Sequence, residues 1–150
     1  MQAVSGLTAH TGYWLRMVSN AVSQDFARKL AAEGVTVAEW VFLRALYDVD
    51  AMAPSALAGK MGMTRGAISK LADRLIEKGL IDRVDNPDDG RAHSLSVTEA
   101  GRARVPVLAA LADRNDADYF GVLSAEEQDA LGRILRRLAE RRGLMAMPLD

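Results

Sequence analysis

Helical periodicity runs through most of this 150-residue chain and is interrupted once, at residues 80–97. Two short apolar runs there, at 80–84 and 92–97, flank a turn-rich stretch that contains Asp89-Gly90, and this pattern predicts a β-hairpin. Apolar spacing and capping signals predict the helices, at 6–33, 36–48, 54–61, 65–78, 98–120 and from 124 onward. A chain with this order is mainly α with one small β-hairpin.

The composition excludes several classes of protein. The hydrophobic fraction of 49% and the charged fraction of 26% are ordinary for a globular chain. Because the chain has no cysteine, a disulfide scaffold, a thiolate zinc site and a thiol switch are excluded. The two histidines, His10 and His93, lie on elements that we do not expect to meet, so we predict no metal site and no cofactor. No apolar run reaches the length of a membrane span and no signal peptide is recognisable, which predicts a cytoplasmic protein.

Residues 54–79 have the pattern of a helix-turn-helix, with the turn at Gly62. The second helix of such a motif enters the major groove of DNA. On a helical wheel the apolar residues of 65–78 share one face, and the opposite face carries small and charged residues. The segment 60–83 holds six basic and three acidic residues, and six minus three gives a local excess of +3 in a chain of net charge −1. An ordinary amphipathic helix with a solvated charged face explains the same pattern, so this helix alone does not decide the function.

The outward residues of the second helix are candidates for contacts with double-stranded DNA. Lys70 and Arg74 are predicted to contact the major groove or phosphates. Thr64, Arg65 and Ser69 are predicted to fix the helix end on the DNA backbone.

The hairpin has the position of a wing, directly after the helix-turn-helix. Arg91, beside the hairpin tip, is predicted to enter the minor groove, with Asp88 or Asp89 holding its guanidinium. The alternative is a solvated loop whose charges only pair with one another. Arg83 has two interpretations, as a DNA contact or as a brace for the wing strand.

Three runs of sequence together resemble the signature of the MarR family of regulators: LIEKGLIDR at 75–83, DDGR at 88–91 and LSVTEAG at 95–101. The preceding Asp73-Arg74 and the order of helices across nearly the whole chain fit as well. The resemblance implies a homodimer formed by the terminal helices, with two recognition helices and two wings on a pseudo-palindromic operator. It also implies repression relieved by a small aromatic or anionic ligand. Members that sense peroxide use a reactive cysteine, which this chain lacks.

Three parts follow from this interpretation: an N-terminal dimerisation helix at 1–33, a winged helix-turn-helix DNA-binding domain at 34–97, and C-terminal dimerisation helices at 98–150. The two ends carry more apolar side chains than a small winged domain can cover, which predicts the homodimer. An intrachain helical bundle around its own core is the alternative. The apolar residues concerned are Leu15, Val18, Val22, Leu108, Leu111, Leu131, Leu135 and Leu138.

The resemblance places a ligand pocket between the dimer helices and the winged domain. Trp14, Met17 and Trp40 are large apolar side chains expected near that junction, and His10 and Arg16 can bind an anion. Trp40 as a plain core residue, and Trp14 and His10 as interface residues, are the alternatives. The Met-rich tail at 145–149 either caps the dimer or is frayed.

Two other classes of function, an enzyme and a protein-binding adaptor, fit the sequence less well. The chain has no nucleophile elbow, phosphate-binding glycine loop or HExxH pattern, so we predict that it is not an enzyme. A winged-helix adaptor that binds a protein has no need of both Lys70 and Arg91. The sequence therefore predicts a sequence-specific DNA-binding transcriptional regulator, and the resemblance to the MarR family implies that it is a repressor.

Overall fold

The computed structural model describes residues 3–85 and 93–150, and its elements confirm a mainly α fold with one small hairpin. An antiparallel pair of strands lies between the fourth and fifth α-helices of the described chain. In chain order the elements are the 3-10 helix η1 (Leu7–Ala9), α1 (Thr11–Ala32), α2 (Val37–Tyr47), α3 (Pro54–Met61), α4 (Arg65–Glu77), β1 (Ile81–Asp85), β2 (His93–Val97), α5 (Glu99–Phe120) and α6 (Ala125–Arg141).

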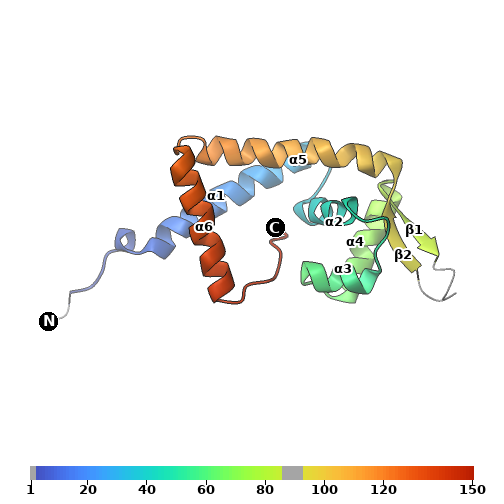
Figure 1. Cartoon of the computed structure of the whole chain (residues 1–150), viewed down its shortest axis with the longest axis horizontal. Coiled ribbons are helices and arrows are strands. Elements are labelled where there is room, and N and C mark those ends of the chain that lie inside the picture. The colour runs from blue at the N-terminus through green and yellow to red at the C-terminus, as the bar shows by residue number, and fades with distance from the viewer. Residues whose placement is uncertain (1–2, 86–92) are drawn as a thin grey trace.

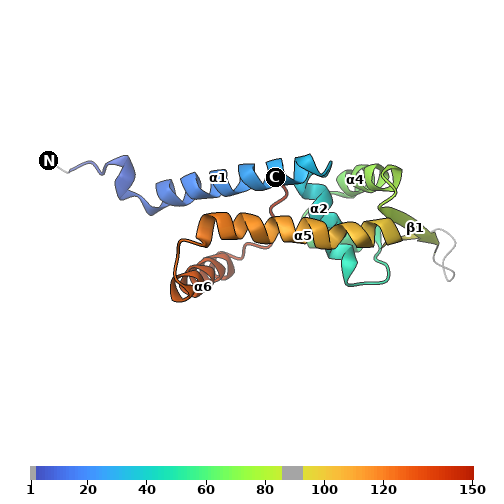
Figure 2. The ribbon, with the colours of Figure 1, turned by 90° about the horizontal axis from the view of Figure 1, so that it is seen from above.

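Two long helices, α1 and α5, lie side by side and connect the two ends of the molecule (Figure 1, Figure 2). At one end, α2, α3, α4 and the hairpin form a compact winged part. At the other end, α6 turns back from the end of α5, and the segment after it returns toward α2 and α3 (Figure 1). The chain is therefore compact at the winged end and open at the α6 end.

The core of the winged part continues into both long helices. Leu30 of α1 and Leu108 of α5 are fully buried together with residues of the winged part. Burial of these side chains is the main stabilisation of such a core, at about 25 cal/mol per Å² of apolar surface. The large, fully buried side chains of the winged part are Phe42, Leu43, Leu46, Leu57, Met61, Ile68, Leu71, Leu75, Ile81 and Leu95.

Local capping signals set the starts of two helices as the sequence predicts. Thr36 Oγ1 accepts from the Glu39 amide at 3.1 Å, and Glu39 Oε1 accepts from the Thr36 amide at 3.0 Å. Ser124 and Glu127 form the same reciprocal capping box at the start of α6. Each box satisfies two amides that a helix start leaves without partners.

Several predicted boundaries differ from the structure by one residue or more, and two of them have a clear physical reason. The helix expected from residue 6 begins at Thr11, because Val4 and Leu7 are exposed and have no core to pack against. The first strand begins at Ile81 and not at residue 80, because both backbone groups of Leu80 serve other elements. Its amide donates to the Leu75 carbonyl at the end of α4, and its carbonyl accepts from the Thr98 amide.

The base of the hairpin is attached to the loop between α2 and α3. The Met52 amide donates to the Leu95 carbonyl at 3.0 Å, and the Leu95 amide donates to the Met52 carbonyl at 2.8 Å. Ser96 Oγ donates to the Asp50 carbonyl at 2.8 Å. These bonds fix the direction of the wing relative to the helix-turn-helix.

The start of α5 is joined to the end of α4. Thr98 Oγ1 donates to the Gly79 carbonyl at 2.7 Å, and the Thr98 amide donates to the Leu80 carbonyl at 3.1 Å. Gly79 has a φ of +75°, a left-handed conformation that favours glycine at a helix end. The two helices consequently meet in one rigid corner.

Candidate nucleic-acid interface

The second helix of the motif, α4, presents the face that the wheel predicts. Ile68, Leu71, Ala72 and Leu75 are buried, which confirms the inward face. Thr64 caps the helix, since its Oγ1 accepts from the Ala67 amide at 3.1 Å. The predicted contact residues of this helix all lie on the exposed side: Thr64, Arg65, Ser69, Lys70 and Arg74.

Two cations of α4 form no ion pair with the described residues, whereas the neighbouring cation of β1 does. Arg83 of β1 pairs with Asp73 of α4 at 2.6 Å. This contact braces the wing strand, which is one of the two roles that the sequence allowed for Arg83. Within the described ranges, Lys70 and Arg74 form no ion pair. They flank a shallow hollow of about 510 Å³ that Met63 of the α3–α4 turn also lines. Their charges are available to a polyanion.

The start of α4 has the electrostatics of an anion-binding site. Its first turn contains no acidic residue, whereas those of α2, α5 and α6 each contain glutamate. Arg65 occupies the first helical position, where the free backbone amides already favour a negative charge. A phosphate group fits this helix end better than a carboxylate side chain of the protein itself.

An ion pair between the buried Glu39 and the exposed Lys78, which the sequence did not reveal, positions the end of α4 against α2. Lys78 Nζ lies 2.8 Å from Glu39 Oε2 and donates to Glu39 Oε1 at 3.0 Å and to the Gly34 carbonyl at 2.8 Å. Burial raises the pKa of Glu39, but the bonds from Lys78 and the Thr36 amide outweigh burial and hold the pKa below its ordinary value. The two residues are 39 positions apart, so no local sequence pattern indicates that they pair. In the structure, the near-complete burial of the Glu39 carboxylate indicates that it needs a partner.

Replacing Lys78 by methionine is expected to lower the free energy of unfolding at pH 7 by about 2 kcal/mol, because Glu39 then stays buried without its counter-charge. The loss should shrink in acid. In the native chain the depressed pKa of Glu39 gives stability above the unfolded-state pKa, and this stability is lost as pH falls through the folded-state pKa. Urea unfolding at pH 7 and pH 4 measures both effects.

Lys60→Met is the matched control, since Lys60 is an exposed lysine of α3 without an ion pair in the described ranges. Its effect should stay within about 0.5 kcal/mol at both pH values. Equal losses for the two variants would contradict the positioning role of Lys78.

The wing tip lies outside the described residues. Arg91, Asp88 and Asp89 fall in the range 86–92, so the predicted minor-groove contact stays a prediction. The described strands carry the base of the hairpin, with Asp85 opposite His93 at the end nearest the tip.

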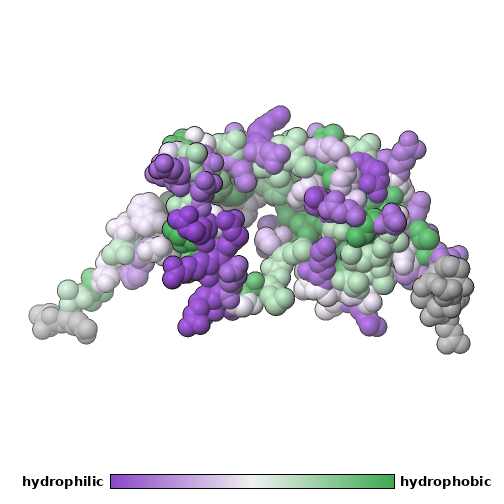
Figure 3. Space-filling model, viewed as in Figure 1, coloured by the Kyte–Doolittle hydropathy of each residue, from purple (hydrophilic) through white to green (hydrophobic). Residues whose placement is uncertain are grey.

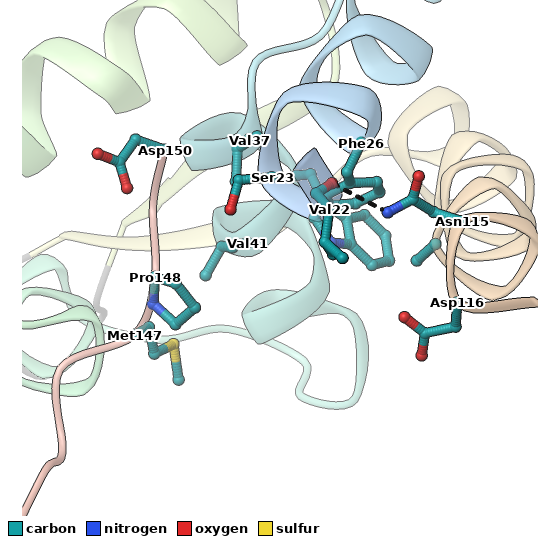
Figure 4. Close-up of a pocket in the computed structure, with 12 residues that line it drawn as sticks. Val22, Ser23, Phe26, Val37, Val41, Asn115, Asp116, Met147, Pro148 and Asp150 are labelled. Carbon is teal, nitrogen blue, oxygen red and sulfur yellow. Dashed lines mark hydrogen bonds between the residues drawn. The ribbon is translucent and has the colours of Figure 1, made fainter. Parts of the chain in front are cut away.

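The structure separates the five predicted ligand residues. Trp40 lines a cavity of about 370 Å³ between α1, α2, α5 and the returning C-terminal segment (Figure 4). Trp14 instead lines an apolar groove between α1, the end of α5 and α6. His10, Arg16 and Met17 are exposed near the start of α1 and line neither space. Phe26 and Asn115, which were not among the predicted ligand residues, face the cavity.

Two further features are missing from the described ranges, 3–85 and 93–150. No helix there is both long enough and apolar enough to cross a membrane. No group of three or more histidine, aspartate or glutamate side chains there can hold a metal ion.

Two solved structures share the fold over nearly their whole length. A transcriptional regulator from Pseudomonas aeruginosa is 30% identical, with a TM-score of 0.75 over 89% of this chain and 99% of that chain. The regulator PcaV from Streptomyces coelicolor, solved in complex with its natural ligand, is 26% identical, with a TM-score of 0.74 over 93% and 98%.

Sequence relatives point to one family. A transcriptional regulatory protein for the hcr operon of Thauera aromatica is 32% identical over 133 residues, which cover 88% of this chain and 80% of the relative. The transcriptional repressor MdtR of Bacillus subtilis is 26% identical over 93% of this chain and 90% of its own length. The model of the MarR family matches residues 33–92. The chain therefore belongs to the MarR family of transcriptional regulators, which bind DNA and catalyse no reaction.

Proposed function

We propose that this chain is a homodimeric repressor that binds a pseudo-palindromic operator and is released from it by a small ligand. The observation that carries the proposal is the exposed face of α4, where Lys70 and Arg74 stand unpaired among the described residues beside a helix start suited to phosphate. Lys70 and Arg74 contact the major groove or phosphates, and Thr64, Arg65 and Ser69 fix the helix on the backbone. Arg91 enters the minor groove.

Dimerisation is proposed from the apolar surface at the open end of the molecule. α6 has no fully buried residue, and Ile134 and Leu138 remain about half exposed. Trp14 and Leu15 of α1, also half exposed, line the apolar groove between α1, the end of α5 and α6, to which α6 contributes Leu131 and Leu135. Pairing of two copies would cover this surface and would set two α4 helices about 34 Å apart, one turn of B-DNA.

The first experiment is a titration of the protein against DNA upstream of its own coding region, with a scrambled duplex as competitor. Specific binding of one dimer per site is the expected result. Affinity should fall by about one log unit per phosphate contact for each tenfold rise in salt. Binding that is equal for both duplexes, or that ignores salt, would speak for a protein partner.

Lys70→Ala is expected to weaken operator binding by about 2 kcal/mol, or roughly thirtyfold, if Lys70 contacts a base, and by less if it contacts only phosphate. Fluorescence anisotropy with a labelled operator measures the change. Arg114→Ala removes an exposed arginine of α5, away from α4, and should change affinity less than twofold. Similar losses for both variants would indicate a general effect of charge.

Control by a ligand is proposed from the cavity at the junction of α1, α2 and α5. Trp40 and Phe26 give it aromatic walls suited to a small aromatic molecule. PcaV, a relative by fold and sequence, was solved with its natural ligand. A ligand that prefers the DNA-incompetent arrangement of the long helices would shift the population away from operator binding.

A further inference from the structure

The C-terminal segment, residues 144–150, forms one wall of the cavity that Trp40 lines. Met147 and Pro148 face the space, and Met147 also packs against the core of the winged part. Figure 4 shows this segment on one side of the space and α5, with Asn115 and Asp116, on the other. Figure 3 shows hydrophobic surface within the hollow between α6 and the winged part. The cavity is thus built from four segments, and its volume of about 370 Å³ suits a small molecule.

The charged lining of this cavity is acidic. Asp116 and Asp150 line it, and no lysine, arginine or histidine of the described residues does. Asp116 forms no ion pair within the described chain, and its carboxylate points from α5 toward the space in Figure 4. Both residues are exposed, and an anion entering the cavity would meet two carboxylates of its own sign, which repel it.

The cation next to this wall is already engaged. Lys29 Nζ donates to Asn115 Oδ1 at 2.9 Å and pairs with Asp118 at 3.2 Å. Asn115, which is buried, uses its amide nitrogen to donate to the Val22 carbonyl at 3.1 Å. These contacts join α1 to α5, so Lys29 is not free to neutralise a ligand carboxylate.

Aromatic faces complete the environment. Trp40 of α2 and Phe26 of α1 also line the cavity, and an aromatic face attracts a cation that lies over it. We propose that the cavity selects a planar aromatic cation over the corresponding anion, with Asp116 as its counter-charge and the 144–150 segment as its outer wall. The proposal rests on the effector role assigned to the cavity above and adds the charge class of the effector.

Three probes of nearly equal shape test the charge preference: 1-naphthylmethylamine, 1-naphthalenemethanol and 1-naphthaleneacetate. The amine is protonated at neutral pH, the alcohol is neutral and the carboxylate is ionised. Calorimetric titration of the full chain should give affinity in the order amine, alcohol, carboxylate, with at least tenfold between the first and the last. A carboxylate that binds as tightly as the amine overturns the proposal, and so does the absence of binding by all three at millimolar concentration.

Asp116→Asn tests the counter-charge with a side chain of the same shape. The amine should lose about tenfold in affinity, while the alcohol should change less than twofold. Asp113→Asn is the matched control, because Asp113 is an exposed carboxylate one turn earlier on α5 that does not line the cavity. Asp113→Asn should lower the affinity for the amine by less than threefold. An unchanged amine affinity in Asp116→Asn, or equal losses in both variants, overturns the assignment of Asp116.

The outcome is separable from that of the proposed function. Calorimetry reports ligand binding without DNA, and the operator titration reports DNA binding without ligand. Operator binding together with a wrong charge order rejects this inference alone. Failure to bind any operator together with the expected charge order rejects the proposed function and leaves the cavity's selectivity standing.

Discussion

Replacing Gly101 by alanine is expected to lower the free energy of unfolding by about 3 kcal/mol, a large effect for one methyl group. Gly101 is buried in the first turn of α5, where a β-carbon would collide with the Leu80 carbonyl oxygen and lie 2.8 Å from Val97 Cγ1. The carbonyl cannot move aside, because it accepts the Thr98 amide in the corner between α4 and α5. The variant must therefore open this corner. Denaturant unfolding followed by far-UV circular dichroism measures the loss.

Gly59→Ala is the matched control for this prediction. Gly59 is exposed within α3, and a β-carbon there meets no atom within 4 Å. Alanine is better than glycine in a helix by about 0.5–1 kcal/mol, so this variant should be slightly more stable than the native chain. A Gly101 variant that is as stable as the Gly59 variant would show that the corner has room to relax.

The double substitution Ile134→Asp with Leu138→Asp is expected to give a monomer whose affinity for the operator falls at least about a hundredfold. Two linked recognition helices gain affinity from one another, and a single α4 reads only half a site. The winged core should remain folded, because α6 contributes no fully buried residue to its own chain. Light scattering after size-exclusion chromatography gives the mass, and anisotropy gives the operator affinity.

Arg133→Asp serves as the control, since it also changes the net charge by −2 but lies on the other face of α6. It should leave both mass and operator affinity near native values. A dimeric double variant would place the interface elsewhere. A monomer that keeps native affinity would remove the need for a dimer in DNA binding.

Local features of the sequence predict much of this fold. The capping boxes at Thr36 and Ser124 act within four residues, so their spacing is visible in the sequence itself. The inward face of α4 follows from a helical period, which needs no knowledge of the partner helices. The predicted contact residues of α4 are on one exposed face for the same reason.

Contacts between residues that are far apart in the chain could not be predicted from the sequence. The pair of Lys78 with Glu39, the bond that Lys29 donates to Asn115 and the bond that Asn115 donates to the Val22 carbonyl depend on how whole helices pack. The same reason explains why the predicted ligand residues do not share one cavity. Trp14 is twelve residues before Phe26 on one straight helix, which places it about 18 Å away along the axis. Hydrophobic character alone does not say which turn of α1 reaches the cavity.

The corner between α4 and α5 makes α5 a lever arm. The helix has 22 residues, so it is about 33 Å long, and a swing of about 5° at its α6 end would move its start by about 3 Å. Thr98 holds the Gly79 and Leu80 carbonyls, so the end of α4 must travel with it. A displacement of that size equals the length of a hydrogen bond to phosphate. A small change where α1, α5 and α6 meet is therefore expected to shift α4 far enough to make or break a contact with DNA.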